Sequence, residues 1–469
     1  MTQDGIIEKQ GARPAEIELD QELVDNIRSL LEAGQRGMVL NIVADLHPAD
    51  LASLMEHLSF DEARQLFQWL PVEQAGEVLA ELDDDYRAEL LEAESLQRLT
   101  AMLGELDTDD AADVLADLPE EVARTVLPHL EDAADLQELL TYEEDSAGGL
   151  MAREFVAVPV SWTVAEAIEE LRRHADVVED VYSVFAVDEQ GHLQGTVSLK
   201  QLLLADPDAR IGDIMDTDVD YVTADVDQEE VARLMERYDL VSLPVVDEQG
   251  RLIGRITIDD VVDVIREEAE EDIQRMSGVA GGEEPTDSVL RIVQGRLPWI
   301  LAGMVGSGVA AFVIGYFSGA LAVVPVLASF IPIVMATAGN AGIQSSAIAV
   351  QGLASGDVWA SDILRRMLKE LLVGLLNGFT AALIMGVFIL IAGHLYPDKI
   401  TDPVRLALTS GAALMIVIVL ATVIGATIPL LLNRIGIDPA IATGPFITGS
   451  NDILGTLIFF WLATHFYLS

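Results

Sequence analysis

The chain has 469 residues, of which 51% are hydrophobic, and it carries a formal net charge of −51 at pH 7. All of this charge comes from residues 1–284, with 19 Lys and Arg against 70 Asp and Glu, whereas residues 285–469 hold 8 of each sign. The surplus argues against nucleic acid and anionic lipid as partners of the acidic part and favours cations; salt adaptation or solubility is the alternative source. The absence of cysteine excludes disulfides, cysteine-ligated zinc and thiol catalysis.

The acidic part begins with a polar segment, residues 1–30, which we expect to be loose. An acidic helical-repeat domain is predicted over 31–145, because leucine recurs every 12 residues and Glu94 alone breaks the series. A unit of this length fits one short amphipathic helix and a turn, and stacked units form a superhelix. The repeated leucines are Leu46, Leu58, Leu70, Leu82, Leu106, Leu118 and Leu130.

A second repeat follows, in which residues 185–203 match residues 244–262 at an offset of 59. Each copy predicts a strand, a tight turn at Glu-Gln-Gly, a second strand and a helix. This α/β pattern is typical of tandem CBS domains, with the first expected over 146–205 and the second over 206–262. The paired glycines that the two copies share are Gly191 with Gly250 and Gly195 with Gly254.

A highly charged helix over about 262–279 is predicted to connect this pair to the rest of the chain, within a connecting segment that we place at 263–290. Residues 291–469 read as an all-α transmembrane domain, because five apolar stretches are long enough to cross a bilayer. These stretches are 298–319, 321–352, 370–393, 404–433 and 440–464.

The orientation follows from the flanking charges. The first 30 residues contain no apolar run behind a basic start, so the N-terminal domains are expected to stay in the cytosol and, with five spans, the C-terminus to lie outside. The flanks then expected inside carry more Lys and Arg than those expected outside, in agreement with the positive-inside rule. The inside set is Arg291, Arg296, Arg365, Arg366, Lys369 and Arg434, and the outside set is Lys399 and Arg405.

Asp452 lies in the middle of the last apolar stretch. A carboxylate at mid-bilayer costs about 2.5–3.5 kcal/mol, so it indicates a water-filled path or a bound cation, although a protonated aspartic acid between helices is the alternative. Residues 336–347, in the second stretch, supply uncharged polar groups that include Asn340. Oxygen ligands without His or Cys suit a hard, hydrated cation better than zinc or copper.

The order of these parts, the GNAGIQSS stretch at 339–346 and the ending with DPA at 438–440 and TGPFITGSNDILG at 443–455 resemble the MgtE family of magnesium transporters. The resemblance implies a homodimer with a pore between the second and fifth spans, where Asp452 binds a largely hydrated Mg²⁺. It also implies a second ion position, in the outer vestibule, at Asp438 on the cytosolic approach, and it makes Asn340 a pore residue.

The family further implies a magnesium sensor, in which Mg²⁺ bridges acidic residues of the helical domain, the CBS pair and the connecting, or plug, helix. Two chains of net charge −51 need such counterions when their faces pack together. A plain solvated acid is the alternative for each position. The corresponding residues here are Asp109, Asp113, Asp227, Glu229, Asp239, Asp260, Asp263, Glu268 and Glu271.

A CBS signature that often contacts an adenosine ribose is present in the second copy as Gly254, Thr257 and Asp260, whereas Gln201 replaces the aspartate in the first copy. ATP, if bound, is therefore expected at Thr257 and Asp260.

The chain lacks a phosphate-binding motor motif and reads as a passive Mg²⁺ channel of the cell membrane, not an enzyme, closed by cytosolic Mg²⁺. The alternatives are a less selective Co²⁺/Mn²⁺/Mg²⁺ transporter and a nucleotide-sensing CBS protein that the spans only anchor.

Overall fold

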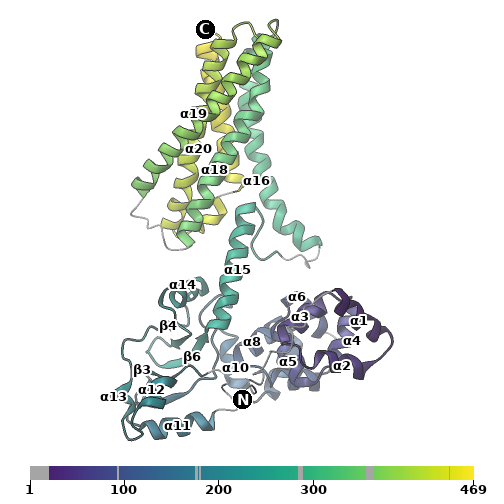
Figure 1. The fold of residues 1–469 in the computed structure, drawn as a ribbon, viewed down its shortest axis with the longest axis vertical. Helices are drawn as coiled ribbons and strands as arrows, with labels where there is room; N and C mark the ends of the chain where they lie inside the picture. The colour runs from purple at the N-terminus through teal and green to yellow at the C-terminus, as the bar shows by residue number, and fades with distance from the viewer. Residues whose placement is uncertain are drawn as a thin grey trace, which may run out of the picture. The chain divides into compact units, whose positions relative to one another are not determined.

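The computed structural model describes residues 21–91, 94–174, 178, 181–283, 289–354, 363–442 and 444–469. The chain divides into two compact units, Met1–Ile265 and Arg266–Ser469, which are considered separately below. The first holds a helical domain and two small α/β domains, and the second holds long apolar helices (Figure 1). The multidomain architecture predicted from the sequence is confirmed.

The helical domain consists of short helices joined by tight turns. Helices begin at 48, 60, 72, 84, 96, 108 and 120, so the 12-residue period of the sequence is the spacing of the helices themselves. The bounds are α1 (Gln21–Glu32), α2 (Arg36–Val43), α3 (Pro48–Glu56), α4 (Phe60–Trp69), α5 (Val72–Ala80), α6 (Asp84–Leu91), α7 (Leu96–Leu103), α8 (Thr108–Asp117), α9 (Glu120–Val126), η1 (Leu127–His129) and α10 (Ala133–Leu139).

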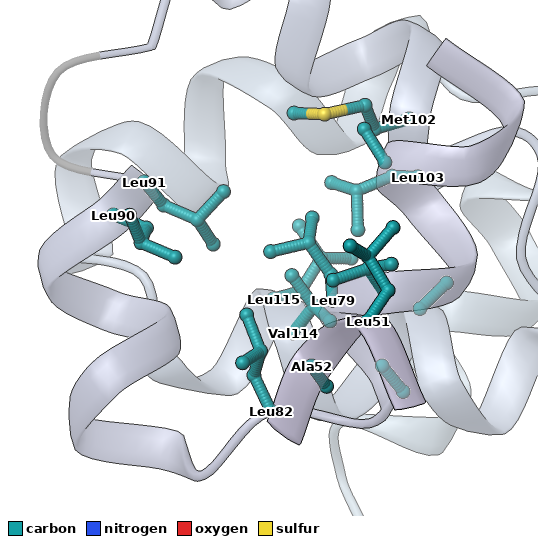
Figure 2. Close-up of a cluster of buried hydrophobic side chains, with 14 of the residues drawn as sticks. Leu51, Ala52, Leu79, Leu82, Leu90, Leu91, Met102, Leu103, Val114 and Leu115 are labelled. Atoms are coloured by element: carbon teal, nitrogen blue, oxygen red, sulfur yellow. The ribbon is translucent and has the colours of Figure 1, made fainter. Parts of the chain in front are cut away.

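Leucines hold this domain together from two kinds of position. The recurrent leucine lies just before each helix, and those at 46, 58, 70, 82, 118 and 130 are buried. Within the helices, Leu51, Leu79, Leu103 and Leu115 point into one cluster (Figure 2). Burying such a side chain contributes about 1.5–3 kcal/mol, and this apolar interior offsets the acidic surface.

The helices pack in two rows. Helix α3 contacts α5, α5 contacts α7 and α7 contacts α9, while α6 contacts α8 and α8 contacts α10. The ring of Phe60 in α4 meets Tyr86 in α6 edge-on, with centroids 5.8 Å apart. From α2 onward, helices therefore pack on the helix two places further along the chain, as the expected superhelix requires.

Each α/β domain has a three-stranded sheet in which the first strand is parallel, and the third antiparallel, to the second. The predicted strand, turn, strand and helix are present in both copies. The bounds are β1 (Ala157–Pro159), α11 (Val164–Arg173), β2 (Ser183–Val187), β3 (Leu193–Ser198), α12 (Leu199–Leu204), α13 (Ile211–Ile214), β4 (Val222–Thr223), α14 (Gln228–Tyr238), β5 (Ser242–Val246), β6 (Leu252–Thr257) and α15 (Ile258–Ser277).

The repeated glycines have distinct structural reasons. Gly191 and Gly250 turn the chain with φ of +86° and +81°, which favours glycine. Gly195 and Gly254 lie where the chain passes close by: a Cβ on Gly195 would stand 2.4 Å from the carbonyl oxygen of Asp216. The first α/β domain has its own core, whereas the second shares one apolar core with the helical domain.

The second unit contains five helical segments long and apolar enough to span a membrane within the described residues, as the sequence predicts. Helix α18 packs on α20 and α21, α19 packs on α20, and α16 packs on α21 (Figure 1). The bounds are α16 (Val289–Tyr316), α17 (Ser318–Val323), η2 (Pro325–Phe330), α18 (Ile331–Ala354), α19 (Ile363–Leu395), α20 (Pro403–Arg434), η4 (Pro439–Ala442), α21 (Pro445–Leu462) and a π-helical turn η5 (Ala463–Tyr467).

Three predicted boundaries need correction. Helix α1 begins at Gln21, inside the segment expected to be loose over 1–30, because Val24, Ile27 and Leu31 form a buried stripe; residues 1–20 lie outside the described residues. The connecting helix α15 begins at Ile258, inside the range given to the second CBS domain, and ends at Ser277. The last span begins at Pro445 rather than 440, after the short turn η4.

Candidate cation sites

An open recess of about 400 Å³ lies between α18 and α21. Its polar lining consists of Asn340 from α18 and of Thr448 and Asp452 from α21. The remaining walls are small or apolar, formed by Ile331, Pro332, Met335, Ala336, Gly339 and Ile343. The structure therefore brings Asp452 and Asn340, 112 positions apart in the sequence, to the same recess.

Asp452 is the charged group of this recess. It lies one turn after Thr448, on the same face of α21, and retains 8% of its surface exposed. A carboxylate between apolar helices is tolerated when it faces a polar cavity. Carboxylate, amide and hydroxyl oxygens are the ligands that suit a hard cation which keeps part of its water, so the donor set fits Mg²⁺.

Asp438 does not line the recess; it is part of an ion-pair network near the start of α21. One carboxylate oxygen accepts a hydrogen bond from the guanidinium of Arg275 at 2.6 Å, and the other accepts from the backbone N–H of Ala440 at 2.7 Å. Arg275 also pairs with Glu271. Burial raises the pKa of Asp272, and the nearby charges of Asp438 and Glu268 raise it further.

Three aspartates crowd together where the helical domain meets the second CBS domain. Asp109 and Asp110 lie in the first turn of α8, and Asp260 lies in the first turn of α15. Burial raises the pKa of all three carboxyls, and the charge of Asp260 adds to the effect on Asp109 and Asp110. Burial first, and then the charge of Asp260 for the two aspartates of α8, disfavour the ionised carboxylates, so the arrangement favours a proton or a cation.

This joint is held in place by neighbouring hydrogen bonds. Glu154, in the linker to the first CBS domain, accepts from the hydroxyl of Thr108 at 2.8 Å and from its backbone N–H at 3.3 Å. Arg153 donates to the carbonyl of Ile253 at 2.6 Å and pairs with Glu138 at 2.7 Å. These bonds fix the N-terminal end of α8 against β6, which places Asp109 beside Asp260.

The other predicted sensor residues are distributed along two helices of the CBS region and on α8. Asp113 and Asp263 are exposed. Asp227 caps the start of α14 and Asp239 ends it in a left-handed conformation, so these two lie about 18 Å apart along one helix. Glu229, in the first turn, pairs with Arg233 at 3.3 Å. A single ion therefore does not bind Asp227 and Asp239 of the same chain.

Mg²⁺ usually retains several waters and takes only one or two protein carboxylates. Within the described ranges no three acidic or histidine side chains form a closed ligand set. The oxygen donors at Asp109, Asp110 and Asp260 suit a hydrated dication in number and type, since two of them suffice.

The predicted nucleotide residues occupy this same joint. Thr257 is 8% exposed, and its hydroxyl donates to the Asp260 carboxylate at 2.8 Å. The matching pair of the first CBS domain, Ser198 and Gln201, is bonded in the same way at 2.9 Å but is more open to solvent. Asp260 is therefore a candidate for both predicted roles, and its charge raises the pKa of Asp109 and Asp110 in α8.

Two residues of these sites do not appear among those predicted. Asp110 completes the aspartate group of α8, and its signal was its place beside Asp109 in a helix first turn. Arg275, which binds Asp438, carries no signal in the sequence, because its partner lies 163 residues away.

Comparison with known proteins agrees with this description. Residues 331–462 match the family described as "Divalent cation transporter", residues 46–145 match the MgtE intracellular N domain, and residues 147–208 and 211–267 match CBS domains. These matches define a membrane transporter of divalent cations with a cytosolic region that contains CBS domains. The chain belongs to the MgtE family of magnesium transporters.

Similar relatives extend over almost the whole chain. The magnesium transporter MgtE of Thermus thermophilus is 36% identical over 95% of this chain and 98% of its own length. The magnesium transporter MgtE of Bacillus subtilis is 31% identical over 95% of this chain and 97% of its own length. A crystal structure of the cytosolic domain of the Mg²⁺ channel MgtE in complex with ATP is 41% identical, with a TM-score of 0.49, and covers 51% of this chain and 99% of that one.

Proposed function

We propose that this member of the family is a passive, homodimeric Mg²⁺ channel of the cell membrane that closes when cytosolic Mg²⁺ rises. The observation that carries the proposal is the placement of Asp452, with Asn340 and Thr448, in an open recess between two membrane-spanning helices. A fixed negative charge there attracts a dication, and the neutral Asn340 and Thr448 supply further oxygens without binding it too tightly to leave.

The driving force in this proposal is the membrane potential. It supplies about 2.3 kcal/mol per elementary charge per 100 mV, and twice that for Mg²⁺. With the N-terminal domains in the cytosol and the C-terminus outside, inward movement of Mg²⁺ needs no other energy source. A less selective pathway for Co²⁺ and Mn²⁺ is the runner-up, because the ligand types alone do not exclude these ions.

Gating is proposed to act through the acidic joint of Asp109, Asp110 and Asp260. Burial and the charge of Asp260 both disfavour ionised Asp109 and Asp110, and a bound Mg²⁺ would offset both effects, which supports a compact arrangement favoured by Mg²⁺. A shift from mostly open to mostly closed needs about 5.5 kcal/mol of differential binding. Shared among about four sites, each one needs only about a tenfold preference.

The pore assignment is tested by Mg²⁺ flux into liposomes that contain the purified full-length protein, without nucleotide. We expect Asp452→Ala and Asp452→Asn to abolish flux while the protein stays folded, because neither side chain carries the charge. Asp398→Asn, at an exposed position outside the spans, is the matched control and should conduct normally. Normal flux through Asp452→Ala would contradict the assignment.

Gating is tested separately by deleting residues 1–262. The truncated protein should conduct at every internal Mg²⁺ concentration, whereas the full chain should close in the millimolar range. A deletion that still closes would show that the acidic region is not the sensor. If the region instead responds to nucleotide and no flux is found, the protein is a CBS-regulated anchor.

A further inference from the structure

One buried amide joins the two helices that form the recess. Asn451 of α21 is 2% exposed, and its Nδ2 donates to the backbone carbonyl oxygen of Ala338 in α18 at 3.2 Å. Asn451 immediately precedes Asp452, and Ala338 lies two residues before Asn340. The hydrogen bond therefore connects positions within two residues of the two polar residues, Asn340 and Asp452, that line the recess from the two helices.

The same relationship between the helix contact and the recess repeats one turn further along both helices. Ala338 and Gly342 of α18 meet Ile447 and Asn451 of α21 along one seam. The residue after each seam residue lines the recess: Gly339, Ile343, Thr448 and Asp452. Since successive helix positions differ by about 100°, the seam forms the edge of the recess along both helices. Any slip along the seam moves the two sides of the recess past one another.

Gly342 provides the space that the amide occupies. A Cβ at Gly342 would stand 2.2 Å from Asn451 Nδ2 and 2.7 Å from the Cγ2 of Ile447. Another glycine approaches Gly342 from a third helix, because a Cβ on Gly425 of α20 would lie 2.3 Å from the Gly342 carbonyl oxygen. Helix α18 is thus held at this level by α20 and α21, with room for no side chain at Gly342.

The plain alternative is that Asn451 only contributes stability. A hydrogen bond at the edge of a cation site has a further effect, because Mg²⁺ holds its remaining waters and ligands in a near-ideal octahedron, whereas larger dications tolerate distortion of the groups around them. A shift of Asn340 relative to Asp452 therefore penalises Mg²⁺ more than Ca²⁺.

We propose that Asn451 is a positioning residue for ion selection. Seated on Gly342 and bonded to Ala338, it sets the axial offset between α18 and α21 and hence the distance from Asn340 to Asp452. The proposal rests on the proposed role of Asp452 as the ion-binding carboxylate.

The test compares initial rates of Mg²⁺ and Ca²⁺ uptake by the full-length protein in liposomes, normalised to inserted protein. In Asn451→Ala we expect the Mg²⁺-to-Ca²⁺ rate ratio to fall about fivefold, the factor that corresponds to one net hydrogen bond of about 1 kcal/mol. Asn451→Ser, whose shorter hydroxyl does not reach α18, should show the same loss. Ser450→Ala is the matched control, because that hydroxyl donates within its own helix to Phe446.

A suppressor experiment separates positioning from stability. Gly342→Ala should lower the same ratio by displacing the amide, and adding Asn451→Ala should partly restore flux, because the smaller side chain relieves the overlap. Gly386→Ala in α19, where a Cβ meets only an ordinary contact at 3.9 Å, is the glycine control and should leave the ratio unchanged.

The outcomes distinguish this inference from the pore assignment. If Asp452→Ala conducts, the pore assignment fails, whatever Asn451 does. If Asp452→Ala is silent while Asn451→Ala loses thermal stability but keeps the wild-type ratio, Asn451 is structural only and the positioning role is overturned. A Gly342→Ala protein with the wild-type ratio would overturn it equally.

Discussion

The guanidinium of Arg275 donates to the carboxylate of Asp438 across 2.6 Å, and this bond joins α15 to the turn that precedes α21. Arg275 also pairs with Glu271 on its own helix. The connecting helix thus presents a built-in positive charge to the aspartate that the sequence assigns to an ion position. Asp272 lies in the same network, so Arg275 is surrounded by more negative charges than it can neutralise.

We expect Arg275→Gln to make the attachment of α15 to this turn depend on Mg²⁺. Without the guanidinium, Asp438, Glu271 and Asp272 repel one another until a dication binds. Flux from wild-type protein and the variant should agree at millimolar internal Mg²⁺, and the variant should conduct several-fold more when internal Mg²⁺ is removed. Arg434→Gln, exposed at the end of α20, controls for the loss of one positive charge. Equal flux under both conditions would show that the ion pair is not part of the gate.

Neutralising the α8 aspartates should mimic Mg²⁺. The double change Asp109→Asn with Asp110→Asn removes the repulsion from Asp260, so the helical and CBS domains should stay together without a dication. The chain has no cysteine, so spin labels at two introduced cysteines, replacing the exposed Glu89 and Lys200, report the distance between the domains.

In cation-free buffer the wild-type distance distribution should be broad and should narrow on addition of Mg²⁺, whereas the double variant should be narrow in both. Glu121→Gln, exposed on the next helix and not among the predicted sensor residues, should behave as wild type. A double variant that still needs Mg²⁺ to narrow would remove these aspartates from the sensor.

The same labels give a pH test in EDTA. Burial and the charge of Asp260 raise the pKa of Asp110 to about 7, so the compact state holds protons that the separated state releases. A group with a raised pKa stabilises the compact state at low pH and loses that contribution as pH rises through the raised value. The distribution should therefore be narrow at about pH 4, broaden as pH rises from about 4 to 7, and change little above that. The opposite direction would contradict the assignment.

Nucleotide binding is predicted at the second CBS domain. Calorimetry on the full-length protein should show that Thr257→Ala and Asp260→Ala lose ATP binding while Ser198→Ala keeps it. Because Asp260 also faces the α8 aspartates, ATP and Mg²⁺ should affect one another if both bind there. Loss of ATP binding in Ser198→Ala alone would place the nucleotide in the first domain.

The sequence predicts the fold well wherever spacing is enough. The 12-residue leucine period gives the helix starts, and even its exception is explained locally: Glu94 is buried beside Arg98, one turn later, at 3.5 Å. The buried stripe of Val24, Ile27 and Leu31 also shows helical spacing, so the extra helix at the N-terminal end was detectable.

For sites formed by residues far apart in the sequence, the sequence predicts the kind of site but not which residues meet there. A carboxylate in an apolar span indicates a cation path, which is why Asp452 was found. The hydrogen bond from Asn451 to Ala338 and the approach of Asp260 to Asp109 join residues more than a hundred positions apart, and periodicity carries no information about such meetings.

Because successive helices of the helical domain alternate between two rows, an even or odd number of added helices has different consequences. Each 12-residue unit places the next helix in the other row, since α3, α5, α7 and α9 pack in sequence and α6, α8 and α10 pack beside them. Inserting one unit before α8 would leave α8 against Asp260, because Glu154 and Arg153 hold the N-terminal end of α8, but it would move the preceding helices to the opposite row; inserting two would return them to their own row. The domain can therefore lengthen on the N-terminal side of α8 without loss of the acidic joint, but its first helices keep their rows only in steps of two helices, or 24 residues.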